Sequence, residues 1–162
     1  MKSLLLIIWY GCMINFTYGQ YNIDSIEIIE NDRNKFVKPT ISVLIYFESL
    51  TIYEWKKTME DLRFESQETK SLPLIYIKGS FGNNAKTQSI AKDKKGVLIS
   101  WMNFKDELVI MDSIENELKP FYADYQGDQK FYLVKKENVT YQFNLKRNTN
   151  LGLEEVYIKK VN

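Results

Sequence analysis

Aromatic, acidic and amide side chains lie close together in one short stretch of the sequence, residues 121–128. Aromatic rings offer flat apolar area, and carboxylates and amides offer fixed hydrogen-bond partners, a combination suited to sugars and peptides. The stretch is therefore the first candidate ligand-binding segment, with candidate residues Phe121, Tyr122, Asp124, Tyr125, Gln126 and Asp128. The alternative is structural: Phe121 and Tyr125 would pack a short helix on the core, with both aspartates in water.

A loop that begins with Gly79 is the second candidate, through Phe81, Asn83, Asn84 and Lys86. Its spacing is not the G-x-x-x-x-G-K-[ST] of a phosphate-binding loop, and no convincing helix follows it. Residues 78–95 form the longest stretch without hydrophobic periodicity. Long loops in compact domains are often functional, so this one is either a binding loop or a plain connection between two strands.

Two residue types that carry much of enzyme chemistry are missing. The sequence has no His, and its single Cys is Cys12, in the leader described below. Without these residues the usual zinc, copper and iron–sulfur sites, a Cys nucleophile and a Ser-His-Asp triad are excluded. Asp124 and Asp128 lack the spacing of a calcium-binding loop. We therefore expect no metal and no cofactor.

Carboxylate chemistry is the catalytic option that remains. A glycoside hydrolase needs two carboxylates at a suitable separation and no imidazole. Six acidic residues of the sequence are candidates for such a pair: Asp106, Glu107, Asp124, Asp128, Glu154 and Glu155. Their spacing in sequence does not pair them in space, so this hydrolase is an alternative to a non-catalytic role.

The first nineteen residues have the layout of a secretory signal peptide. Lys2 precedes the apolar run of residues 4–10, and Thr17-Tyr18-Gly19 ends in a small residue before Gln20. We therefore expect residues 1–19 to be removed and residues 20–162 to form one exported globular domain, secreted or periplasmic. A lipid anchor at Cys12 is a less favoured alternative, and the apolar run falls short of the ~20 residues that span a bilayer.

Charge argues against nucleic acid as a partner. The formal net charge is +1, so no strong basic field exists to attract phosphates. Asn138-Val139-Thr140 matches the acceptor pattern for N-linked glycans, at a predicted turn.

One helix is predicted over residues 52–64. Thr51 and Glu54 have the spacing of a capping box, in which each side chain binds a backbone N–H of the other residue. Apolar residues then recur at three and four positions along one face: Ile52, Trp55, Met59 and Leu62. Asp112 and Glu115 have the same capping spacing, which predicts a second short helix within 113–126, either over 113–119 or starting at Pro120.

The remaining segments read mainly as strands. We expect strands at 23–29, 41–47, 72–77, 97–104 and 108–111, and a meander over 130–136, 139–145 and 153–161. Residues 41–47 are almost continuously apolar, which indicates a central strand covered on both faces. About eight strands and one clear helix give an α+β fold, mainly antiparallel sheet.

These observations favour a non-catalytic exported domain that binds a protein, peptide or glycan outside the cytoplasm. A carboxylate-dependent glycoside hydrolase is one alternative, and a structural component of the cell envelope is another. One tyrosine lies in each strand of the predicted meander, and the three would line a recognition face if all pointed outward: Tyr132, Tyr141 and Tyr157.

Overall fold

The computed structural model describes residue 23 and residues 26–31, 34–67, 73–79, 86–102, 109–126, 129–148 and 150–161. Within them the fold is α+β and mainly antiparallel, as predicted. A hairpin of β1 (Ile28–Asn31) and β2 (Asn34–Val37) precedes helices α1 (Ile41–Ser49) and α2 (Ile52–Asp61). The remaining strands come after α2 in two runs, which helix α3 (Val109–Leu118) and the short 3-10 turn η3 (Lys119–Phe121) separate from each other.

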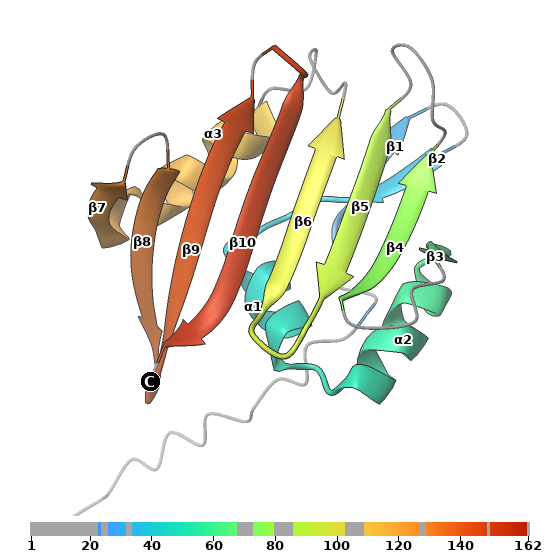
Figure 1. Ribbon diagram of the computed structural model, residues 1–162, viewed down its shortest axis with the longest axis horizontal. Helices are drawn as coiled ribbons and strands as arrows, with labels where there is room; N and C mark the ends of the chain where they lie inside the picture. The colour runs from blue at the N-terminus through green and yellow to red at the C-terminus, as the bar shows by residue number, and fades with distance from the viewer. Residues whose placement is uncertain are drawn as a thin grey trace, which may run out of the picture.

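Those strands form one eight-stranded antiparallel sheet in the order β3-β4-β5-β6-β10-β9-β8-β7 (Figure 1). The first run comprises β3 (Glu65–Gln67), β4 (Leu74–Gly79), β5 (Thr87–Lys92) and β6 (Val97–Met102). The second comprises β7 (Tyr122–Gln126), β8 (Gln129–Lys136), β9 (Val139–Asn148) and β10 (Leu153–Val161). The last strand of each run, β6 and β10, pair with each other at the middle of the sheet.

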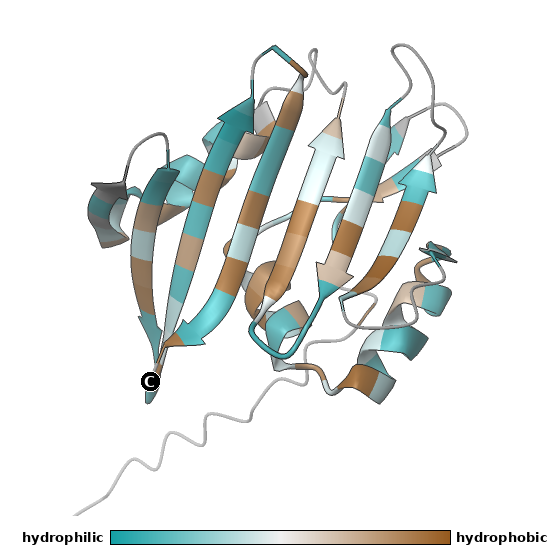
Figure 2. Ribbon diagram, viewed as in Figure 1, coloured by the Kyte–Doolittle hydropathy of each residue, from teal (hydrophilic) through white to brown (hydrophobic). Residues whose placement is uncertain are grey.

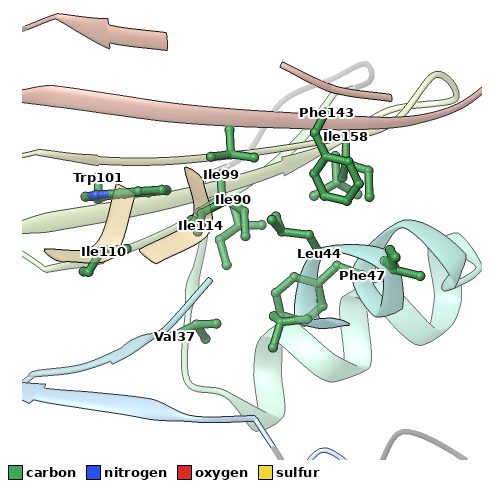
Figure 3. Close-up of a cluster of buried hydrophobic side chains, with 14 of the residues drawn as sticks. Val37, Leu44, Phe47, Ile90, Ile99, Trp101, Ile110, Ile114, Phe143 and Ile158 are labelled. Atoms are coloured by element: carbon green, nitrogen blue, oxygen red, sulfur yellow. The ribbon is translucent and has the colours of Figure 1, made fainter. Parts of the chain in front are cut away.

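Alternation along the strands divides the sheet into a buried face and an open face. Val156 and Ile158 of β10 are fully buried, while Tyr157 between them is half-buried on the other side. Figure 2 shows the same alternation as bands of apolar and polar residues along the strands. The helices and the β1–β2 hairpin pack on the buried face, as Figures 1 and 3 both show. The predicted tyrosine face is therefore wrong, because Tyr132 and Tyr141 lie buried on the helix side.

The core fills the space between this face and the helices. In Figure 3, Leu44 and Phe47 of α1 and Val37 of β2 lie on one side, and Ile90 and Ile99 of the sheet lie opposite. Trp55 of α2 is fully buried and contacts Phe47 edge-on, with ring centroids 5.6 Å apart. Aromatic side chains bury large apolar areas, so this cluster anchors both N-terminal helices on the sheet.

The predicted strand at 41–47 is wrong, because residues Ile41–Ser49 form helix α1. Thr40 caps its first turn, its hydroxyl accepting from the backbone N–H of Val43 at 3.2 Å. Helix α1 contacts β6, β10 and α3, so apolar side chains are buried around most of it. A helix buried on several sides has no polar stripe, and periodicity alone cannot separate it from a buried strand.

The predicted helix at 52–64 is confirmed as α2, which ends at Asp61. Its capping box forms as expected: the Thr51 N–H donates to the Glu54 carboxylate at 2.8 Å, and the Glu54 N–H donates to the Thr51 hydroxyl at 3.3 Å. Because the helix lies at the surface with one face on the core, its sequence retains the amphipathic period that made it predictable.

Strand β5 was expected to be part of the loop at 78–95, and that prediction is wrong for residues 87–92. Its inward positions are Gln88, Ile90 and Lys92, of which two are polar. The Gln88 amide accepts from the Val37 N–H at 2.9 Å and donates to the Val37 carbonyl at 2.7 Å. It thereby ties the β1–β2 hairpin to the sheet, since both backbone groups would otherwise be buried without a partner.

Further along the chain, the predicted strand at 97–104 is confirmed over Val97–Met102 as β6, with residues 103–104 outside the described part, but residues 109–111 begin helix α3 instead of a second strand. Asp112 lies in the first turn of that helix, so it is not the cap that its spacing with Glu115 predicted. A helix starting at Pro120 is also wrong, because residues 122–126 form β7. The three-stranded meander is confirmed as β8, β9 and β10.

Candidate binding groove

A groove of about 650 Å³ lies between α3 and the first two strands of the second run. Two kinds of side chain line it, aromatic from the strands and polar from α3 and the first residue of η3: Asp112, Glu115, Asn116, Lys119, Tyr122 and Tyr132. Helix residues three or four positions apart share a face, which brings Asp112, Glu115 and Lys119 together. The η3 turn, with Pro120 in its first turn, then ends the helix and directs the chain into β7.

Two tyrosines form the aromatic wall of this groove. Tyr122 and Tyr132 are opposite residues of β7 and β8, and their rings meet edge-on with centroids 5.9 Å apart. Tyr132 is buried at 3% exposure, whereas Tyr122 is 48% exposed. The buried ring fixes the position of the exposed one, which gives the groove a firmly held aromatic surface in contact with solvent.

Ion pairs hold the acidic side chains of the groove. Arg147 of β9 contacts the Asp112 carboxylate, and Lys130 of β8 contacts that of Glu115. The Arg147 Nε also lies 3.2 Å from a Glu154 carboxylate oxygen. These contacts place the carboxylates as hydrogen-bond acceptors of fixed position.

Glu154, the other carboxylate that Arg147 contacts, is buried, with 8% of the residue exposed. It accepts a hydrogen bond from the Trp101 indole Nε1 at 2.9 Å. Burial raises the pKa of the Glu154 carboxyl, while the Trp101 hydrogen bond and the Arg147 charge oppose that rise. Glu154 is not among the residues that line the groove, so its observed role is to hold Trp101 and Arg147 in place.

The structure separates the residues predicted at 121–128. Tyr122 lies in the groove, and Phe121 is 40% exposed in η3 next to it. A register shift between Tyr122 and Asp124 pairs Asp124 with Phe131, which puts Asp124 on the open face of the sheet. An extra residue in a strand reverses the side on which later residues emerge, so the two candidates lie on opposite faces.

The other predicted site residues are only partly described. Tyr125 and Gln126 belong to strand β7, with only their backbone described. Lys86 is half-buried directly before β5, outside the groove. Asp128, Phe81, Asn83 and Asn84 lie outside the described residues, as do Asp106 and Glu107.

Sequence reasoning missed most of the residues that line the groove. Asp112 and Glu115 were noted only as a helix cap, and Tyr132 as part of an open face. The available signal was the spacing of Asp112, Glu115 and Lys119, which follows the three- and four-residue period of one helix face. That face meets β8 and β9 through contacts such as Arg147 with Asp112, which are 35 residues apart and which local pattern does not encode.

The described part of the chain contains no cluster of three or more potential metal-ligating side chains. None of its helices is both long and apolar enough to cross a bilayer. No protein-family model, curated protein or solved structure matches this sequence or fold.

Proposed function

We propose that the chain is a non-catalytic exported domain that binds a glycan in the groove between α3 and β8. The observation that carries the proposal is the exposed ring of Tyr122, which packs on buried Tyr132 in a groove lined also by carboxylate and amide groups of α3 and the ammonium group of Lys119 in η3. Sugar rings present an apolar face ringed by hydroxyls, so an aromatic surface with polar groups beside it suits them.

The charge balance of the groove supports a neutral ligand. Asp112 and Glu115 are each matched by a cation, Arg147 and Lys130. A neutral sugar can accept from and donate to such paired groups without leaving a charge unmatched, whereas a strongly charged ligand would compete with these pairs. The predicted signal peptide agrees with a role outside the cytoplasm.

A hydrolytic role has less support in the groove. Its two carboxylates, Asp112 and Glu115, come from one helix turn and are both paired with cations. Glycoside hydrolases place their two carboxyl groups on either side of the bond that breaks, with one of them able to donate a proton. The ion-paired arrangement instead favours holding a ligand.

The test is titration of the purified protein with short oligosaccharides of glucose, N-acetylglucosamine, mannose and galactose, followed by NMR. Tyr122→Ala is expected to weaken binding of the sugar that binds best by about tenfold, through loss of the aromatic surface. Tyr122→Phe keeps the ring and is expected to retain most of the affinity.

Leu133→Ala is the matched control, because Leu133 is similarly exposed on β8 but points to the open face. Equal weakening by both alanine variants, or binding of unstructured peptides in preference to every sugar, would overturn the glycan proposal. Release of reducing sugar during incubation would instead support the hydrolase.

A further inference from the structure

A second groove, of about 510 Å³, lies in the first half of the sheet. It is formed by the C-terminal end of α2, strands β3 and β4, and the β1–β2 hairpin. Its charged lining residues are Lys35, Asp61, Arg63, Glu65 and Lys78. This groove lies far from the groove that Tyr122 lines, since β4 and β8 lie toward opposite edges of the sheet (Figure 1).

Lys78 is held in an unusual place for an ammonium group. Its Nζ lies 4.5 Å from the centre of the Phe64 ring and donates to the Leu62 carbonyl at the end of α2. Burial, together with the nearby positive charge of Arg63, lowers the pKa of Lys78 to about 8. A much larger fraction of Lys78 than of an ordinary lysine is therefore free amine near neutral pH.

Arg63 brings a second cation to the same groove. It is exposed, and its backbone has the left-handed φ of 59° as the chain leaves α2. Among the described residues no ion pair involves Arg63. The third cation, Lys35, pairs with Glu30 at 2.7 Å, so Arg63 is the cation available to an incoming anion.

We propose that this second groove reversibly binds a small aldehyde or keto acid, with Lys78 forming a Schiff base and Arg63 holding the ligand carboxylate. The unprotonated Lys78 amine adds to the carbonyl carbon, forming a C–N bond. The former carbonyl oxygen takes one proton from the nitrogen and one from solvent, the nitrogen lone pair forms the C=N bond as the C–O bond breaks and water leaves, and the last N–H proton returns to solvent. No oxidant or reductant is needed, and hydrolysis reverses the step.

The other charged groups restrict the ligand. Asp61 and Glu65 line the same groove and repel a ligand with several negative charges. Arg63 can bind one carboxylate through its planar guanidinium. The arrangement therefore fits a ligand with one carboxylate close to its carbonyl group.

The experiment traps the adduct on the purified protein with glyoxylate and sodium cyanoborohydride at pH 7.5, followed by peptide mass mapping. Reduction converts the Schiff base at Lys78 into N-carboxymethyl-lysine. Lys57, exposed on α2, serves as the internal reference. Lys78 is expected to react at least about tenfold faster than Lys57, because the free amine is the reactive form.

Acetaldehyde, which lacks the carboxylate, tests the role of Arg63. Arg63→Gln removes the charge that helps lower the pKa of Lys78, so it is expected to slow labelling by both aldehydes, and to slow labelling by glyoxylate several-fold more than labelling by acetaldehyde. Lys57→Gln, a matched loss of charge on the exposed side of α2, is expected to change neither rate at Lys78. Labelling of Lys78 no faster than Lys57 overturns the proposal, and an equal effect of Arg63→Gln on both aldehydes overturns the assignment of the carboxylate.

Discussion

Several polar side chains on the buried face of the sheet hold backbone or side-chain groups of neighbouring elements. Lys92 donates to the carbonyls of Phe47 and Glu48, in the last turn of α1, at 2.9 and 2.8 Å. Lys78 does the same for Leu62 after α2. Neither helix has a basic residue in its own last turn, so strand lysines supply the positive charge that helix C-termini favour.

The lowered pKa of Lys78 predicts a pH-dependent stability. The unfolded chain keeps the ordinary lysine value near 10.5, and the folded chain has a pKa of about 8, so folding releases a proton between these limits. The fold is therefore disfavoured by the charged side chain below pH 8, and this penalty disappears as pH rises to 10.5. Lys78→Met is expected to gain about 1 kcal/mol relative to wild type at pH 7 and to lose that gain by pH 10.5.

Urea unfolding of both proteins at pH 7 and pH 10.5 measures this difference. Lys57→Met, on the exposed side of α2, is the control and is expected to show no such pH dependence. A Lys78→Met difference that is the same at both pH values would contradict the lowered pKa.

Glu154 allows a matched pair of substitutions. Its raised pKa means that the protonated carboxyl suits the fold better than the charged one, and Gln resembles the protonated form. Glu154→Gln keeps an acceptor for Trp101 and is expected to change the free energy of unfolding by less than about 1 kcal/mol. Glu154→Leu leaves the buried indole N–H unpaired and is expected to cost about 1–3 kcal/mol.

Thermal and urea unfolding at pH 7 distinguish the two outcomes. Equal losses for Gln and Leu would show that the contact with Arg147, and not the hydrogen bond from Trp101, is what Glu154 contributes.

Among the secondary-structure elements, those with one exposed side could be predicted from sequence. Helix α2 has its capping box and one buried stripe, and β8, β9 and β10 are separated by turn residues. Helix α1 could not be predicted, because its buried surroundings remove the amphipathic period. Strand β5 was hidden because Gln88 and Lys92 occupy two of its inward positions, where the alternation rule expects apolar residues.

The candidate groove was predictable only in part, because tertiary packing brings together residues that are far apart in the sequence. Tyr122 was found because aromatic and acidic residues are adjacent there in sequence. Asp112 and Glu115 of α3 come close to Tyr122 only through tertiary packing. The register shift that places Asp124 outside the groove, on the open face, has no marker such as Gly in the sequence.

Thr40 provides a direct test of the revised assignment of α1. Thr40→Ala removes the hydroxyl that accepts from the Val43 N–H and is expected to cost about 1 kcal/mol, whereas Thr40→Ser keeps it and costs less. Denaturant unfolding of the two variants gives the comparison. If residues 41–47 formed a strand, the two substitutions would not differ through a cap.

At the scale of the whole molecule, the architecture repeats although the sequence shows no repeat. Each half is a helix followed by four consecutive strands, and each half has a groove beside its helix and its first two strands. The halves are joined in the sheet by the single β6–β10 pairing. The stability of the described fold therefore depends on that junction.

Gly96, in the turn before β6, lies against this junction. A Cβ at Gly96 would lie 2.1 Å from the Ile158 carbonyl oxygen and 3.0 Å from the Tyr157 hydroxyl. Gly96→Ala is expected to displace β10 and cost about 2–4 kcal/mol, measured by urea unfolding. Lys94→Ala in the same turn is the control and is expected to stay within about 0.5 kcal/mol of wild type.

The lengths of the strands have a consequence for behaviour in concentrated solution. The longest, β9 and β10, lie inside the sheet, and the two rims are β3 and β7, three and five residues long. An approaching foreign strand gains only a few backbone hydrogen bonds at such a rim, so growth of fibrils by stacking of whole folded molecules is disfavoured. The short edge strands thus protect a chain without disulfides from aggregating by backbone pairing between the edges of two sheets.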